Sequence, residues 1–320
     1  MTTAVYDRFE GLFIPHVTPF DDSGELDLES LERLAAHFAA IPGVAGLVSC
    51  ARIGEGPVLT LEEKRRVYEI AGRVARRAGR VHVATIAPQS TAEAVALVRD
   101  LEKLAVDAVM IFPPLLFAWG EVGGDLKVRF FEELAAATML PLVLFQVPVK
   151  SYWYDVETIC RIARLKNVAA FKEASFDREL FAETARRLGR EQAAMKILTG
   201  NDRFVAESYG LGARGALIGV ANLATERWAA LDAAGRAGDG TRALAIQQGL
   251  DRLKELVFSE PIVEAVARIK AVLRHQGLIR SAAVRKPQLG ISAAEQRELL
   301  EGYGALAARG PAEPEAPSAV

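Results

Sequence analysis

Short, continuous runs of apolar residues alternate along the chain with longer stretches whose apolar positions recur at helical spacing. The first two runs, at residues 11–17 and 44–50, flank a pattern that predicts a helix near Leu28–Ala40. Further strand-like runs then follow at regular intervals, at residues 81–87, 107–112, 141–147, 167–172, 195–199 and 215–220.

Each of these runs precedes a helical pattern, and two of the helices begin at a predicted capping box, Thr60 with Glu63 and Ser90 with Glu93. The strands lack polar alternation, as expected when helices cover the outside of a parallel sheet and layered side chains fill the inside. Eight such units predict an α/β protein with a (β/α)8 TIM barrel. A doubly wound open sheet is the alternative.

Helical patterns continue beyond the eighth unit. The barrel is expected over residues 1–225, and helices packed on it over residues 226–308, with patterns at residues 242–258, 261–275 and 293–307. No linker rich in Pro, Gly or Ser separates the two parts, so one compact body is expected. Residues 309–320 are rich in Pro, Ala and Glu and are expected to be a disordered tail.

Charge and cysteine content narrow the choice of partners and compartment. The 320 residues carry 39 basic and 41 acidic side chains that are interspersed along the chain and form no long run of one sign. The sequence therefore shows no basic patch that would bind nucleic acid or an anionic membrane. No apolar run approaches the roughly 20 residues of a membrane span, and no secretory signal opens the chain. Two cysteines, Cys50 and Cys160, suit a reducing compartment. A cytoplasmic protein with a small-molecule partner is expected.

Lys172 stands at the end of the sixth predicted strand, where active sites of such barrels lie. Period-2 alternation places it on the inner face with Ala170 and Val168, and Phe171 toward the helices. Burial lowers the pKa of an amine, so the neutral form becomes available to attack a ketone carbonyl. Lys172 is therefore the candidate catalytic residue, a Schiff-base lysine that needs no cofactor. The alternative is that its amine reaches solvent from the strand end.

Motifs at the strand ends resemble those of the dihydrodipicolinate synthase and N-acetylneuraminate lyase family. The resemblance covers about residues 11–289, and its order along the chain makes it specific. It implies a barrel with C-terminal helices, a Schiff-base role for Lys172, a 2-oxo acid substrate and a homo-oligomer, either a tetramer or a dimer. The matching segments are residues 14–20 (IPHVTPF), 54–55 (GE), 112–114 (FPP), 146–148 (QVP), 171–174 (FKEA), 199–202 (TGND) and 219–222 (GVAN).

The chain departs from the family pattern where the resemblance implies a proton relay. Phe145 stands where relatives place a tyrosine, and residues 51–55 read ARIGE where relatives have Gly-Thr-Thr-Gly-Glu. Leu115 and Leu116 align with an aromatic pair that completes a neighbour's site in many relatives. A general acid–base group typically contributes about 10²- to 10⁴-fold in rate, so the loss indicates changed chemistry or another proton carrier. The candidate carriers are Glu55, Glu173, Tyr152, Tyr154, Ser175 or a water molecule.

Charged residues near the same strand ends are candidates for substrate binding. Arg52 could hold a carboxylate through two parallel hydrogen bonds, and Lys150 aligns near an arginine that binds substrate in relatives. The alternative is that Arg52 and Lys150 are loop residues whose charged groups are solvated by water and bind no substrate. The substrate-binding residues are predicted to be Arg52, Ile53, Gly54, Phe145, Gln146, Lys150 and Leu217.

The expected activity is that of a lyase acting on a 2-oxo acid, such as a 2-oxo-3-deoxy sugar acid, either as a dehydratase or as an aldolase that releases pyruvate. The alternatives are 4-hydroxy-tetrahydrodipicolinate synthase and a family member that only binds a 2-oxo acid. The four histidines are scattered without metal-ligand spacing, so no metal is expected. Gly210 and Gly212 indicate a helix end rather than a phosphate loop.

Overall fold

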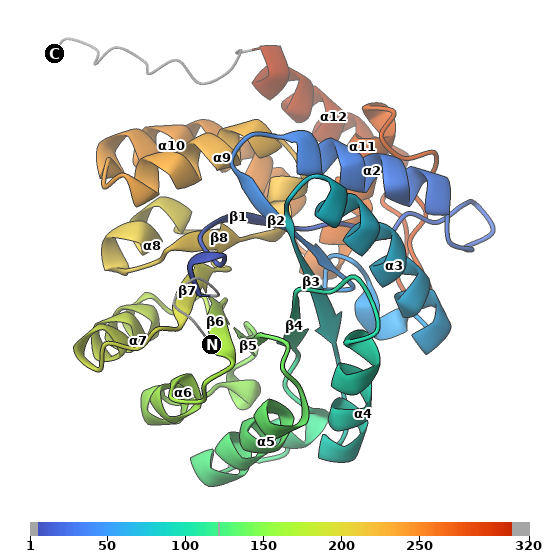
Figure 1. The fold of residues 1–320 in the computed structure, drawn as a ribbon. Helices are drawn as coiled ribbons and strands as arrows, with labels where there is room; N and C mark the ends of the chain where they lie inside the picture. Colours follow the sequence, from blue (N-terminus) through green and yellow to red (C-terminus); the bar gives the residue numbers. More distant parts are fainter. Residues whose placement is uncertain (1–5, 121, 309–320) are drawn as a thin grey trace, which may run out of the picture.

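The computed structural model describes residues 6–120 and 122–308. Its eight strands pair in parallel and in sequence order, and β8 pairs with β1, so the sheet closes into a barrel surrounded by helices (Figure 1). The predicted (β/α)8 barrel is confirmed, and the closure excludes the open sheet. The strands are β1 Gly11–Pro15, β2 Val44–Ser49, β3 Val81–Ile86, β4 Ala108–Ile111, β5 Leu142–Gln146, β6 Val168–Glu173, β7 Lys196–Thr199 and β8 Gly215–Leu217.

One α-helix follows each strand, and three further α-helices come after them along the chain. Those of the barrel are α2 Leu28–Ala40, α3 Leu61–Arg77, α4 Thr91–Leu101, α5 Gly124–Ala137, α6 Val156–Ala163, α7 Arg178–Arg190, α8 Val205–Leu211 and α9 Thr225–Arg236, and the last three are α10 Gly240–Val257, α11 Ala265–His275 and α12 Ala293–Ala308. Short 3-10 helices are η1 Gly56–Val58, η2 Leu115–Ala118, η3 Lys150–Tyr152, η4 Gly219–Asn222 and η5 Ile262–Glu264.

Local signals in the sequence explain where several helices begin and end. Thr60 and Glu63 form the predicted capping box of α3. At α4 the Ser90 side chain accepts from the backbone of Glu93, whereas the Glu93 carboxylate accepts from the backbone of Gln89 at 2.8 Å, so the predicted second box is only half formed. Gly212 ends α8 with a φ of 120°, as expected for a glycine that stops a helix.

Two apolar layers fill the protein, one inside the barrel and one between the strands and the helices. Phe171 belongs to the outer layer, and Ala170 to the inner one, as predicted for the neighbours of Lys172. The prediction for Val168 is wrong, because this residue packs in the outer layer. The register between β5 and β6 is irregular here, and the extra residue Ala169 reverses the alternation below Ala170.

The last part of the chain differs from the predicted pattern in two places. The eighth strand ends at Leu217 because the following residues turn into η4, where the Asn222 side chain donates to the carbonyls of Pro15 and Gly219 at 3.0 Å each. Helix α9 packs on β1 and β8 and completes the barrel, so the predicted boundary at residue 225 falls where this helix begins.

Helices α10, α11 and α12 pack together on one side of the barrel (Figure 1). The expected tail at residues 309–320 lies outside the described residues. None of the described helices is both long and apolar enough to cross a membrane.

Candidate active site

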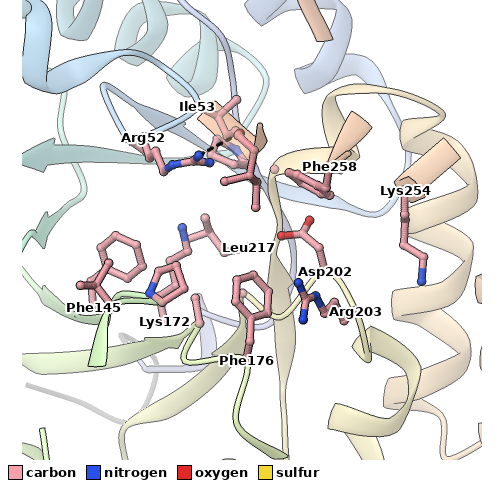
Figure 2. A pocket seen from close by; sticks show the side chains of 18 of the residues that line it. Arg52, Ile53, Phe145, Lys172, Phe176, Asp202, Arg203, Leu217, Lys254 and Phe258 are labelled. Atoms are coloured by element: carbon pink, nitrogen blue, oxygen red, sulfur yellow. Dashed lines mark hydrogen bonds between the residues drawn. The ribbon is translucent and has the colours of Figure 1, made fainter. Parts of the chain in front are cut away.

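A cavity of about 600 Å³ opens at the carboxyl ends of the strands (Figure 2). Its floor comes from the strand ends and the loops that follow them, and its outer wall comes from α10 and η5. The cavity is lined by Pro15, Ala51, Arg52, Ile53, Phe145, Pro148, Val149, Lys172, Ala174, Phe176, Gly200, Asp202, Arg203, Leu217, Gly219, Asp251, Lys254, Glu255, Phe258 and Ile262.

Lys172 reaches the floor of this cavity from β6 and is only 8% exposed. The sequence provides space for its long side chain. A Cβ atom on Gly200 would lie 3.1 Å from Cε of Lys172 and 2.7 Å from Cβ of Ala174, so a glycine is required for this packing. Ala170, two residues earlier on the inner face, is also small. The amine is thus buried in protein yet borders a space that a ligand can enter.

The surroundings of Lys172 favour a neutral amine. Burial lowers its pKa to about 8, with the Asp202 carboxylate opposing that shift and the Arg52 guanidinium adding to it. The Nζ atom lies 4.2 Å from the centroid of the Phe145 ring, and no acceptor in the described part of the chain hydrogen-bonds to it. At physiological pH an amine with this pKa has a much larger neutral fraction than an ordinary lysine, and the neutral form can act as a nucleophile.

Asp202 and Arg52 approach the same space from two other elements (Figure 2). Asp202 follows β7, is 8% exposed, and accepts a 3.2 Å hydrogen bond from the backbone N–H of Val220 through Oδ1. Burial raises the pKa of its carboxyl to about 6, against the lowering effects of the Val220 N–H, Lys172 and Arg52. This carboxyl therefore keeps a small protonated fraction at neutral pH, unlike an ordinary aspartate.

Arg52 follows β2 and extends its guanidinium over the cavity, where Nη2 donates to the carbonyl of Ile262 at 3.2 Å. Its side chain is open to solvent through the mouth, yet burial by the surrounding protein lowers the pKa of the guanidinium, partly offset by Asp202. No ion pair shorter than 4.0 Å joins Asp202 to Arg52 or Lys172 among the described residues. The three charged groups thus surround an open space.

The structure brings together five of the residues predicted for the site. Arg52, Ile53, Phe145 and Leu217 line the cavity with Lys172. Ile53 and Phe145 give its floor an apolar surface where the family pattern has hydroxyl groups. The remaining predicted residues lie elsewhere.

Gly54 does not line the cavity, and its carbonyl accepts a 2.7 Å hydrogen bond from the hydroxyl of Thr18. Gln146 is buried beneath the loop after β5, where its side-chain oxygen accepts from the backbone N–H of Tyr154 at 3.0 Å. Lys150 is exposed on η3 and is absent from the cavity wall. The first two support loops that shape the site, and neither they nor Lys150 border the space beside Lys172.

None of the candidate replacements for the tyrosine lines the cavity. Glu55 forms a fully buried ion pair with Lys270 and accepts from the backbone of Arg285 at 2.8 Å. The carboxylate of Glu173 accepts from Asn201 at 2.5 Å and from the backbone of Ser175 at 3.0 Å. Tyr154 is buried in the outer apolar layer, and Tyr152 packs as a half-buried side chain between the two layers. These groups therefore have structural contacts of their own.

Several cavity residues were not predicted from the sequence. Asp202 lies in the TGND segment after β7 and could have been found by the same strand-end rule that identified Lys172. Phe176 likewise follows β6. Phe258, Lys254 and Ile262 come from the C-terminal helical region, where no strand pattern indicates that they reach the barrel mouth. In the described part of the chain, no three His, Cys, Asp or Glu side chains are grouped so as to hold a metal ion.

A buried lysine with a lowered pKa at the mouth of a (β/α)8 barrel suits a lyase of the aldolase type. The chain belongs to the dihydrodipicolinate synthetase family, whose family model matches residues 8–303. It is 32% identical over 285 residues to the 4-hydroxy-tetrahydrodipicolinate synthase of Moorella thermoacetica, which covers 88% of this chain and 93% of that protein.

Solved structures support the same assignment. The dihydrodipicolinate synthase of Thermotoga maritima superposes with a TM-score of 0.86 at 25% identity, over 94% of this chain and 99% of that one. The chloride-inhibited dihydrodipicolinate synthase of Acinetobacter baumannii, solved in complex with pyruvate, superposes with a TM-score of 0.82 at 25% identity, over 92% and 99% of the two chains. The predicted family is confirmed.

Proposed function

We propose that Lys172 forms a Schiff base with a 2-oxo acid and that the protein makes or breaks a bond to the carbon atoms beyond the resulting imine. One observation carries this proposal: a buried lysine with a pKa lowered to about 8 borders a cavity large enough for a small organic acid. A lysine that only solvated a strand end would have no reason to be desolvated there.

The chemistry follows from the amine. Neutral Lys172 attacks the keto carbon, and loss of water leaves an iminium ion that withdraws electrons from C3. Removal of a C3 proton then gives an enamine. From the enamine, a bond from C3 to an aldehyde carbon can form, and in reverse the C3–C4 bond of a 4-hydroxy-2-oxo acid breaks as its hydroxyl loses a proton. Alternatively, a hydroxyl group leaves C4, which is dehydration.

Carbon–carbon chemistry is the better supported of these reactions. The relatives named 4-hydroxy-tetrahydrodipicolinate synthase and the solved relative in complex with pyruvate favour pyruvate as the 2-oxo acid. A 2-oxo-3-deoxy sugar acid carries several hydroxyl groups, whereas the side chains that line the cavity are either apolar or charged. We therefore place an aldolase that uses or releases pyruvate ahead of a sugar-acid dehydratase.

The synthase named for the relatives is a second candidate, favoured by sequence identity over nearly the whole chain. Phe145 and Ile53 weigh against it, since they stand where the family pattern implies a tyrosine and a threonine. A group other than a phenol must then move protons at this site. The chain can therefore catalyse the synthase reaction only if another of its groups carries these protons.

Arg52 is the proposed partner for the substrate carboxylate. Its guanidinium overhangs the space beside Lys172, uses one N–H on the Ile262 carbonyl, and keeps the others for a ligand. A guanidinium offers the fork geometry that a planar carboxylate accepts. This contact would orient the keto carbon toward the amine.

We also propose that the protein is a homo-oligomer. Leu115 and Leu116 are 47% and 52% exposed on η2, and Trp119, directly after η2, is 73% exposed. The resemblance aligns the two leucines with an aromatic pair that completes a neighbour's site in many relatives. Burial of such side chains against a second copy would remove apolar surface from water. Analytical ultracentrifugation of the wild type and Leu116→Asp tests this: the variant should have a lower sedimentation coefficient, and a monomeric wild type would refute it.

Turnover of a substrate panel tests the proposed reaction. We expect release of pyruvate from at least one 4-hydroxy-2-oxo acid, or its condensation with an aldehyde, and loss of that activity in Lys172→Ala. The same panel includes 2-oxo-3-deoxy sugar acids and assays formation of 4-hydroxy-tetrahydrodipicolinate, which separates the three reactions. An enzyme that forms the adduct but turns over nothing would contradict the proposed lyase activity and support the binding-only alternative.

A further inference from the structure

The cavity around Lys172 is poor in groups that can exchange protons. None of the 20 described residues that line it has a hydroxyl, amide, thiol or imidazole side chain. Imine and enamine formation nevertheless require protons to move between the substrate and a second group. Arginine stays protonated at all ordinary pH values, so only the amines and the carboxyl groups of the lining remain.

Three carboxyl groups line the cavity, and two of them lie at its outer wall on α10. Asp251 forms a 2.6 Å ion pair with Lys254, and exposed Glu255 lies 3.6 Å from Arg252. Asp202 is different, because it is buried at a strand end on the same floor as Lys172. In Figure 2 its carboxylate points into the cavity, whereas the Lys254 side chain points away from Lys172.

We propose that Asp202 is the general acid–base group that moves protons between the substrate and Lys172, in place of the hydroxyl absent at Phe145. This inference rests on the proposed function, since it needs a Schiff base at Lys172. Asp202 lies outside the tyrosine and threonine positions to which the resemblance assigns the proton relay, so those positions do not indicate it.

The contacts of Asp202 suit this role. The Val220 N–H donates to Oδ1, and apart from the N–H of Asp202 itself no other described group donates to the carboxyl, which leaves Oδ2 accessible to a substrate. The charged groups that face the carboxyl are Lys172 on β6, Arg52 after β2, the adjacent Arg203, and the Asp251, Lys254 and Glu255 side chains of α10. With a pKa of about 6, the carboxyl can both give and take a proton near neutral pH.

The proposed steps balance in protons and charge. Neutral Lys172 attacks the keto carbon, and one amine proton passes to the former carbonyl oxygen to give a carbinolamine. Protonated Asp202 then donates to that hydroxyl, which leaves as water, so that an iminium ion faces an Asp202 carboxylate. The carboxylate removes a C3 proton to give the neutral enamine and regenerate the acid.

Exchange of the methyl protons of pyruvate with deuterium from D₂O isolates this last step. We expect the wild type to catalyse exchange, and Asp202→Asn to lower its rate by about 10²- to 10⁴-fold. The Asn side chain can still accept from the Val220 N–H, so the fold should be retained, as circular dichroism would check. Asp125→Asn, the same change at an exposed carboxylate that is paired with Arg161 outside the cavity, should leave the rate within about twofold of the wild type.

The pH dependence of adduct formation, trapped with borohydride at early times, gives a second readout. The reacting form has neutral Lys172 and protonated Asp202, so the wild-type rate should rise to about pH 6, level off, and fall above about pH 8. In Asp202→Asn the fall above pH 8 should disappear. The rate should instead rise to a plateau with an apparent pKa below 8, because the Asp202 carboxylate normally raises the pKa of Lys172.

The outcomes separate this inference from the function on which it rests. Wild-type adduct and exchange that persist unchanged in Asp202→Asn, or an alkaline fall that remains in the variant, would overturn the role of Asp202 while leaving the Schiff base in place. A wild type that forms no adduct with pyruvate or any other 2-oxo acid would overturn the proposed function itself, and the role of Asp202 with it.

Discussion

The amine of Lys172 lies 4.2 Å from the centroid of the Phe145 ring, on the strand next to its own. The ring face stabilises positive charge near the amine, but a phenylalanine cannot take up or release a proton. The pair thus keeps the lysine to which the family resemblance assigns the Schiff base, and it lacks the hydroxyl group that usually accompanies that lysine.

Replacing Phe145 by tyrosine should therefore not produce a working 4-hydroxy-tetrahydrodipicolinate synthase. A new phenol would find Arg52 and Ile53 in the segment where the family pattern provides hydroxyl partners. Formation of the synthase product is the measurement, and Lys172→Ala in the Phe145→Tyr background is the control. Robust synthase activity from Phe145→Tyr alone would show that those hydroxyl partners are dispensable.

Replacing Arg52 by glutamine should raise the pKa of Lys172 and weaken binding of the 2-oxo acid. The guanidinium lowers the pKa of the amine, after the larger effect of burial, so its removal favours the ammonium form. At a fixed pH below 8 less neutral amine remains, so adduct formation should slow, and the alkaline fall of its pH profile should move to higher pH. The KM should also rise, since a charged hydrogen bond is lost.

Arg203→Gln is the matched control for that change. Arg203 lines the cavity but is exposed and does not contribute to the shift of Lys172. Its replacement should leave the pH profile of adduct formation where it is in the wild type. Equal shifts from both variants would mean that Arg52 acts only through the overall charge of the cavity.

Removing one partner of the buried ion pair between Glu55 and Lys270 should strongly destabilise the protein. Both side chains are fully buried, and the Glu55 carboxylate also holds the backbone of Arg285, which ties the C-terminal segment to the loop carrying Arg52 and Ile53. Lys270→Met would leave a buried carboxylate without its cation, at a cost of about 3–5 kcal/mol in the free energy of unfolding. Urea denaturation measures this loss.

Arg161→Met provides the comparison for an exposed pair. Arg161 contacts Asp125 at 2.6 Å, but the Asp125 side chain is 91% exposed. A surface pair of this kind is worth about 0–1 kcal/mol. Comparable losses in the two variants would contradict the importance given to burial of the Glu55–Lys270 pair.

The strands, the barrel and Lys172 could be predicted because apolar runs and strand ends have a direct signature in the sequence. The inward direction of Val168 could not, since the irregular register at Ala169 depends on pairing with β5. Asp202 was within reach of the strand-end rule, but Glu55 and Glu173 are buried too, and only the folded structure shows which of these carboxyl groups lines the cavity. Phe258 and Lys254 reach the cavity through the packing of α10, which no local pattern encodes.

Borohydride reduction in the presence of pyruvate and other 2-oxo acids, followed by mass spectrometry of peptides, tests the role of Lys172 most directly. Lys270 is an internal control, because its pKa is also lowered to about 8 by burial while its amine is paired with Glu55 and does not line the cavity. We predict a reduced adduct on Lys172 and none on Lys270. An unmodified Lys172 across the whole panel, or equal labelling of the two lysines, would contradict a Schiff-base mechanism at this site.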